Sequence, residues 1–123
     1  MALLFAALIA VIHVYVFFLE SVSWGSLGTN RLFRVGEADA KTLRKMAFNQ
    51  GFYNLFLALA ILAGLALRLW KHDVEGNTLM DYAALSVFGA GFVLFASDTS
   101  LKRTALIQAL PALGYLGFRF LGY

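Results

Sequence analysis

The stretch MAFNQGFYNLFLALAILAGLAL, residues 46–67, decides the fold class of this chain. It contains no charged side chain, and it is long enough to cross the ~30 Å hydrocarbon core of a bilayer, which takes about 20 apolar residues of helix. Its apolar residues do not alternate with polar ones, as they would in a strand of a membrane barrel. The stretch therefore predicts a membrane-spanning helix.

The composition of the whole chain also favours a membrane protein. Of its 123 residues, 61% are hydrophobic and 14% are charged. A soluble domain of this size could not bury so much apolar surface, because small domains leave much of their chain exposed. The chain has no cysteine, which excludes disulfide bonds and thiolate metal sites within this sequence. We expect a single integral membrane domain, residues 1–123.

Three more apolar stretches complete a predicted all-α bundle of four transmembrane helices. The expected helices cover residues 2–24, 46–67, 79–97 and 104–121. A basic loop is expected at 25–45. Small residues in transmembrane helices let their backbones approach closely. We expect this role for Gly64, Gly89 and Gly91.

The charges of the connections predict an orientation. Seven basic residues lie in the connections 25–45 and 98–103, namely Arg31, Arg34, Lys41, Arg44, Lys45, Lys102 and Arg103. The other connection and the tail carry three, which are Arg68, Lys71 and Arg119. Because basic residues favour the cytoplasmic side of a membrane, we expect 25–45 and 98–103 in the cytoplasm and both termini outside.

Polar side chains open the second predicted helix: Asn49, Gln50, Tyr53 and Asn54. Lipid offers them no hydrogen-bond partner, so they must face protein, water or a ligand. On the first helix, one narrow face of a regular α-helix carries His13, Phe17, Glu20 and Trp24. The antiparallel arrangement puts Glu20 level with Asn49 and Gln50. Gln108 lies near the start of the fourth helix, at the same end. Asp98 is also expected there, where it caps a helix or pairs with Lys102 or Arg103. These side chains predict a polar pocket in one half of the bundle.

Glu20 is the strongest functional candidate in this pocket. A charged carboxylate inside a span costs about 2.5–3.5 kcal/mol or more, so such a group is normally paired, protonated or functional. Glu20 and His13 could act as acid and base on a bound substrate while Tyr53 orients an oxygen. The catalytic candidates are therefore His13, Glu20 and Tyr53, and the ligand-binding candidates are Trp24, Asn49, Gln50, Asn54 and Gln108. Hydrogen bonds between helices would explain the same residues without any ligand.

Metal and cofactor chemistry have little support in the sequence. His13 and Glu20 offer at most two inward ligands, without an HExxH pattern, so we expect no metal and no other cofactor. Nucleotide loops and nucleic-acid signatures are absent. The expected partners are membrane lipids and a lipophilic small molecule, while a homo-oligomer or a larger membrane complex remains open.

Three segments carry a family resemblance: His13 to Trp24, the run NQGFYN at 49–54 and the run QALPAL at 108–113. They resemble a family of small bacterial membrane proteins catalogued only as a domain of unknown function. The resemblance spans nearly the whole chain. It implies four helices, a polar core and the bacterial inner membrane, but no activity.

A fainter likeness concerns the membrane-associated glutathione transferase and eicosanoid superfamily. The spacing of Arg44, Gln50, Tyr53 and Asn54 is similar to that of the residues which face glutathione in those proteins. Tyr53 stands in the place of their glutamate and Gln50 in the place of their first asparagine. Because of these two departures, the likeness is an analogy of spacing, and it does not carry over a glutathione site.

We expect a protein that binds or converts a lipophilic small molecule in the predicted pocket, with acid–base isomerisation as one form of conversion. Whether it is an enzyme stays open. The alternative is a structural or accessory subunit of a larger membrane complex. Transport is a third reading and needs a polar route across both leaflets. The other half of the predicted bundle is expected to supply no comparable polar residues.

Overall fold

Seven helical segments make up the protein, which a computed structural model describes over residues 1–122. They are α1 (Ala2–Phe17), the π-helical turn η1 (Phe18–Val22), α2 (Leu27–Phe33), α3 (Glu37–Leu69), α4 (Asp73–Ser97), the 3₁₀ turn η2 (Thr99–Leu101) and α5 (Lys102–Phe120). No strand occurs among these residues. The predicted all-α class is confirmed.

Three of the helices are long and apolar enough to cross a membrane. They are Ala2–Val22, which joins α1 and η1, Glu37–Leu69 and Asp73–Ser97. The fourth predicted span corresponds to α5, which is not among them. Its apolar run is interrupted by Gln108, Pro111 and Arg119. The membrane class thus rests on three helices of the described chain.

The expected loop at 25–45 is largely helical, so that part of the prediction is wrong. Ser26 caps α2 through its side chain, which accepts a hydrogen bond from the Thr29 backbone N–H at 3.3 Å. The helix α3 then begins at Glu37 and not at 46. Its first turn carries Glu37 and Asp39, which interact favourably with the positive end of the helix dipole. Good helix formers such as Ala, Lys and Arg follow.

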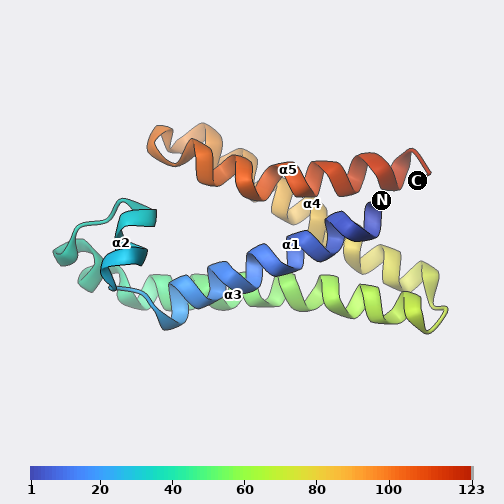
Figure 1. Ribbon diagram of the computed structural model, residues 1–123, viewed down its shortest axis with the longest axis horizontal. Coiled ribbons are helices and arrows are strands. Elements are labelled where there is room, and N and C mark those ends of the chain that lie inside the picture. The colour runs from blue at the N-terminus through green and yellow to red at the C-terminus, as the bar shows by residue number, and fades with distance from the viewer. Residues whose placement is uncertain (123) are drawn as a thin grey trace.

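The early start of α3 has a consequence for the position of the site. A helix of 33 residues is about 50 Å long, which exceeds the ~30 Å of bilayer hydrocarbon. An upright α3 is therefore longer than the apolar core of a membrane, and its first turns are its polar part. Figure 1 shows α2 beside these turns, at the end of the molecule opposite to the two chain ends.

The long helices are neighbours in a closed ring. The helix α1 packs on α3 and α5, and α4 packs on the same two helices from the other side. Mostly small side chains fill the core, together with the fully buried Tyr115. Figure 1 shows the turn between α3 and α4 at the same end as the two chain ends. The seven basic residues predicted to be cytoplasmic lie in α2 and its C-cap, at the start of α3 and in the first turn of α5.

Glycines set the closest helix contacts. A Cβ added at Gly64 would lie 2.7 Å from the Gly76 carbonyl oxygen, and one at Gly91 would lie 2.8 Å from the Ala109 Cβ. The prediction of close approach is confirmed for these two. It is wrong for Gly89, where a Cβ would meet nothing within 4 Å. Gly51, which was not among the predicted close contacts, lets η1 lie directly against α3, since a Cβ there would lie 3.0 Å from the Ser21 backbone nitrogen.

Candidate functional site

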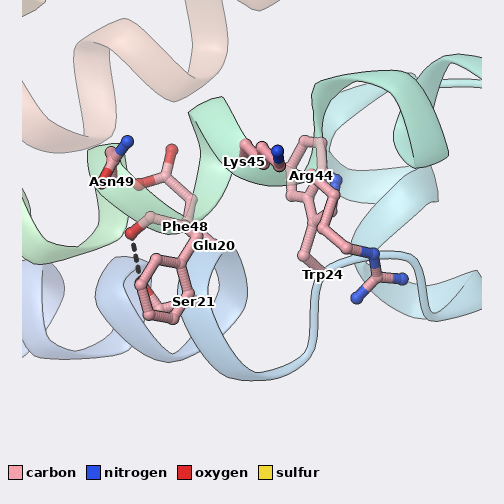
Figure 2. Close-up of a pocket in the computed structure, with 7 residues that line it drawn as sticks. All are labelled: Glu20, Ser21, Trp24, Arg44, Lys45, Phe48 and Asn49. Carbon is pink, nitrogen blue, oxygen red and sulfur yellow. Dashed lines mark hydrogen bonds between the residues drawn. The ribbon is translucent and has the colours of Figure 1, made fainter.

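An open cavity of about 420 Å³ lies between η1 and the first half of α3. Its lining combines a carboxylate, two basic side chains, an amide and two aromatic rings. Figure 2 shows the seven residues that line it: Glu20, Ser21, Trp24, Arg44, Lys45, Phe48 and Asn49. The cavity is thus formed where the first span-capable segment meets the polar first turns of α3.

Glu20 lies on the π-helical turn that ends the first span. The Ser23 backbone N–H donates to the Phe18 carbonyl oxygen at 2.9 Å, which is the wide i to i+5 bond of such a turn. Only 9% of Glu20 is exposed. Its Oε2 accepts a hydrogen bond of 2.8 Å from the Asn54 side-chain amide, which also donates to the Gln50 carbonyl oxygen at 3.0 Å. Within residues 1–122, the second carboxylate oxygen, Oε1, makes no hydrogen bond.

The wall of the cavity is fixed by contacts between η1 and α3. The Ser21 hydroxyl donates to the Phe48 carbonyl oxygen at 2.9 Å. A Cβ added at Gly51 would lie 3.0 Å from the Ser21 backbone nitrogen and 3.1 Å from the Glu20 Cβ. The absence of a side chain at Gly51 thus allows Glu20 to reach Asn54.

Trp24 lines the part of the cavity next to the first turns of α3. Its indole N–H donates to the Ala40 carbonyl oxygen at 2.8 Å, and its ring packs edge-on against Phe33 at a centroid distance of 5.3 Å. Ala40 belongs to the part of α3 that the sequence analysis assigned to a loop. The helical extension therefore supplies both the support of Trp24 and the position of Arg44 and Lys45.

The charges around the cavity remain separate. Arg44 and Lys45 are exposed and line the same space as Glu20, yet neither forms an ion pair with it in the described chain. In Figure 2, Glu20 and Asn49 lie on one side of the view, while Trp24 and Arg44 lie on the other. The cavity thus offers a hydrogen-bond acceptor at one side and cationic donors at the other.

The structure brings some of the predicted site residues together. Glu20, Trp24 and Asn49 line the cavity. The Asn54 side-chain amide donates one hydrogen bond to the Glu20 carboxylate and another to the Gln50 backbone carbonyl oxygen. These five residues form one connected site.

Three predicted site residues lie elsewhere: His13, Tyr53 and Gln108. The His13 side chain is 2% exposed, and its Nδ1–H donates to the Ile9 carbonyl oxygen of its own helix at 2.9 Å. The Tyr53 side chain is 64% exposed and does not line the cavity. Gln108 lies on α5, which packs on α1 and α4. The π-helical turn breaks the regular α spacing that the shared face of His13 and Glu20 assumed.

The opposite end of the bundle also brings polar side chains together, so the expectation that it would supply no comparable polar residues is wrong. The Tyr115 hydroxyl donates to Asp81 Oδ1 at 2.7 Å, and Arg119 Nε lies 3.3 Å from the same oxygen. Arg68 Nη1 donates to Asn77 Oδ1 at 3.0 Å, beside an ion pair to Asp73 at 3.4 Å. The feature of the sequence that could have revealed these polar contacts is Asp81, an acidic residue inside an otherwise apolar stretch.

The described residues hold no group of three or more His, Cys, Asp or Glu side chains able to bind a metal ion. The carboxylate of Glu20 is paired with an amide and stands near cations. Chemically, the site suits a polar head group with its own hydrogen-bond donor.

Fold and site together define a class: a helical protein with three helices long and apolar enough to span a membrane and a polar cavity at one end. Residues 7–119 match the family described as "Protein of unknown function (DUF1304)", and the chain belongs to this family. The family resemblance drawn from the sequence is therefore confirmed. No curated protein and no solved structure matches the chain, and the likeness to the membrane-associated glutathione transferase superfamily has no support.

Proposed function

We propose that this protein binds an amphiphilic small molecule with a zwitterionic head group at the membrane interface, in the cavity between η1 and α3. The head group would donate a hydrogen bond to Glu20, and its anionic part would face Arg44 and Lys45. The lipophilic part would pack against Trp24 and Phe48. Such a ligand matches the donors, acceptor and rings that line the space.

The Glu20 carboxylate is the observation that carries this proposal. The residue as a whole is buried, and within residues 1–122 only Oε2 has a hydrogen-bond partner, while Oε1 stays accessible to solvent. A buried carboxylate is costly unless its oxygens are paired. Two cationic side chains line the same cavity without pairing to it. A ligand donor placed in the cavity would satisfy Oε1.

Binding has more geometric support than conversion. The acid–base hypothesis requires His13 and Tyr53 to act on the molecule that Glu20 holds. Neither residue lines the cavity, and the Nδ1–H of His13 is engaged by its own helix. Proton transfer between Glu20 and His13 therefore stays a prediction.

We also propose that α5 is a fourth span and that the end with α2 and η2 faces the cytoplasm. The helix α5 packs along α1 and α4, as a member of the same ring as the three apolar helices. Seven of the ten basic residues belong to the end proposed as cytoplasmic. The cavity around Glu20 would then open to the cytoplasmic leaflet.

Tryptophan fluorescence tests the binding proposal, because Trp24 lines the cavity and the chain has only one other tryptophan. In a Trp70→Phe protein, Trp24 becomes the only tryptophan reporter. We would titrate this protein with lysophosphatidylethanolamine, which carries an ammonium group, a phosphate and one acyl chain. We expect a saturable change in Trp24 emission.

The matched variants are Glu20→Gln, in the cavity, and Glu75→Gln, at an exposed position near the start of α4. A hydrogen bond to a charged group contributes about 1.5–3 kcal/mol, so Glu20→Gln should weaken binding by about tenfold or more. Glu75→Gln should bind as the parent does. Equal affinity in the two variants, or a change in emission that never saturates, would contradict the proposal.

A further inference from the structure

Two arginine side chains line a second cavity, at the end of the bundle opposite to Glu20. This cavity has a volume of about 350 Å³ and is lined by Met1, Ala2, Leu3, Arg68, Arg119 and Gly122. Arg68 comes from the last turn of α3 and Arg119 from the last turn of α5. Figure 1 shows the chain ends and the α3–α4 turn at this end.

Each arginine is oriented by a carboxylate outside the cavity. Arg68 pairs through Nε with Asp73 at 3.4 Å and donates through Nη1 to Asn77 at 3.0 Å. The Nε of Arg119 lies 3.3 Å from Asp81, whose oxygen also accepts the hydrogen bond from Tyr115. Neither carboxylate lines the cavity. The two guanidinium groups are therefore held in place before any ligand binds.

In the described part of the chain, several N–H donors of these two guanidinium groups have no hydrogen-bond partner. An arginine has five N–H donors. Within residues 1–122, Nη2 of Arg68 makes no hydrogen bond, and the Arg119 guanidinium has the Asp81 carboxylate and the Tyr115 hydroxyl beside it. The Nε–H of Arg119 is buried and forms no hydrogen bond either, although it lies near Asp81. Asp73 and Asp81 balance the two charges from outside the cavity, so the unpaired N–H donors are the groups that an anion in the cavity would engage.

We propose that this cavity binds a phosphate group, supplied either by the head of a phospholipid or as free phosphate. Guanidinium groups match phosphate oxygens with paired, charge-assisted hydrogen bonds. Side chains from α1, α3 and α5 surround this pocket. It is a separate site, and it does not depend on what binds at Glu20.

Native mass spectrometry of the delipidated protein tests this proposal. The protein would be titrated with phosphatidylglycerol, with diacylglycerol of the same acyl chains, and with inorganic phosphate. The variants are Arg68→Gln and Arg119→Gln, and the matched control is Lys71→Gln. Lys71 is a cation at the same end of the bundle, is exposed and does not line the cavity.

We expect each arginine variant to weaken the tightest phosphatidylglycerol binding by about tenfold or more, because each removes charge-assisted hydrogen bonds. Lys71→Gln should leave it unchanged, and diacylglycerol should bind weakly to every variant. Competition by inorganic phosphate at equal concentration would support the phosphate site and name free phosphate as its source. No competition would support the lipid as the source.

The proposal is overturned if phosphatidylglycerol binds the arginine variants as tightly as Lys71→Gln, or if diacylglycerol binds as tightly as phosphatidylglycerol. Arg119→Gln loses the ion pair with Asp81 and could fail to fold. Arg68→Gln then decides, because Arg68 lies at the end of α3 and a third of its side chain is exposed. A rise in the melting temperature on adding phosphatidylglycerol, present in Lys71→Gln and absent in Arg68→Gln, gives a second readout.

Discussion

Replacing Gly51 with alanine should push the first span away from α3 at the Glu20 cavity. The new Cβ would fall on the Ser21 hydroxyl, 3.0 Å from the Ser21 backbone nitrogen and 3.1 Å from the Glu20 Cβ. The hydroxyl can rotate away, but it then loses its hydrogen bond to the Phe48 carbonyl oxygen. The backbone nitrogen cannot move without η1 moving.

The size of the effect follows from these contacts. Overpacking a close contact costs about 1–3 kcal/mol, and the lost hydrogen bond adds about 1 kcal/mol. The higher helix propensity of alanine offsets about 0.5–1 kcal/mol of that. We therefore expect Gly51→Ala to lower the free energy of unfolding by about 1–3 kcal/mol.

Gly89→Ala is the matched control, since Gly89 is also inside a long helix and its added Cβ would meet nothing within 4 Å. It should leave stability unchanged or raise it by up to about 1 kcal/mol. The assay is unfolding in mixed detergent micelles, followed by circular dichroism, with Trp24 emission as a local readout. The reasoning is refuted if Gly51→Ala is as stable as Gly89→Ala and keeps the parent Trp24 emission.

Three more predictions follow from other parts of the fold. Tyr115→Phe should destabilise the protein by about 1–3 kcal/mol, because it removes the hydrogen bond of a buried tyrosine to a carboxylate. The control Tyr82→Phe, at an exposed position, should change stability by less than about 0.5 kcal/mol. Equal effects of the two variants in an unfolding titration would contradict this prediction. Hydrogen bonds from the Ser100 hydroxyl and backbone N–H, helped by the charge of Arg34, hold the pKa of Asp98 below its ordinary value. The folded pKa is the lower one, so the cap should stabilise η2 above the ordinary carboxyl pKa and be lost as the pH falls through the depressed folded pKa. The Ser100 amide signal in NMR should follow that titration, and a signal that titrates equally in Asp98→Asn would rule it out. Finally, the single-cysteine variants Asp39→Cys and Thr99→Cys should react with a thiol reagent only from the cytoplasmic side, and Gly122→Cys should react only from outside. If Thr99→Cys and Gly122→Cys are labelled from the same side, α5 does not cross the membrane.

The sequence predicted the helices well where lipid dictates them. Long runs without charge can only be buried in lipid or protein, so their existence and class follow from composition. The start of α3 could not be read in this way. Residues 37–45 are polar, and a polar stretch beside a span is equally compatible with a loop until Glu37, Asp39 and the helix formers after them are weighed.

The site was only partly predictable, for two physical reasons. A π-helical turn changes the rotation between His13 and Glu20, and regular α spacing does not reveal it. The order of helices around a ring is also invisible in one sequence, so Gln108 was grouped with residues of α3, which is not its neighbour. The pairing of Asp81 with Tyr115 across α4 and α5 depends on the same order.

The central claim is that the cavity around Glu20 holds an amphiphile, and native mass spectrometry of gently extracted protein tests it most directly. The parent protein, Glu20→Gln and Glu75→Gln would be purified side by side, and the molecules that leave each on activation would be identified. We predict one amphiphile with a zwitterionic head, bound at one per chain in the parent and in Glu75→Gln and depleted in Glu20→Gln. A parent protein that carries no such molecule, or three proteins that carry it equally, would contradict the claim.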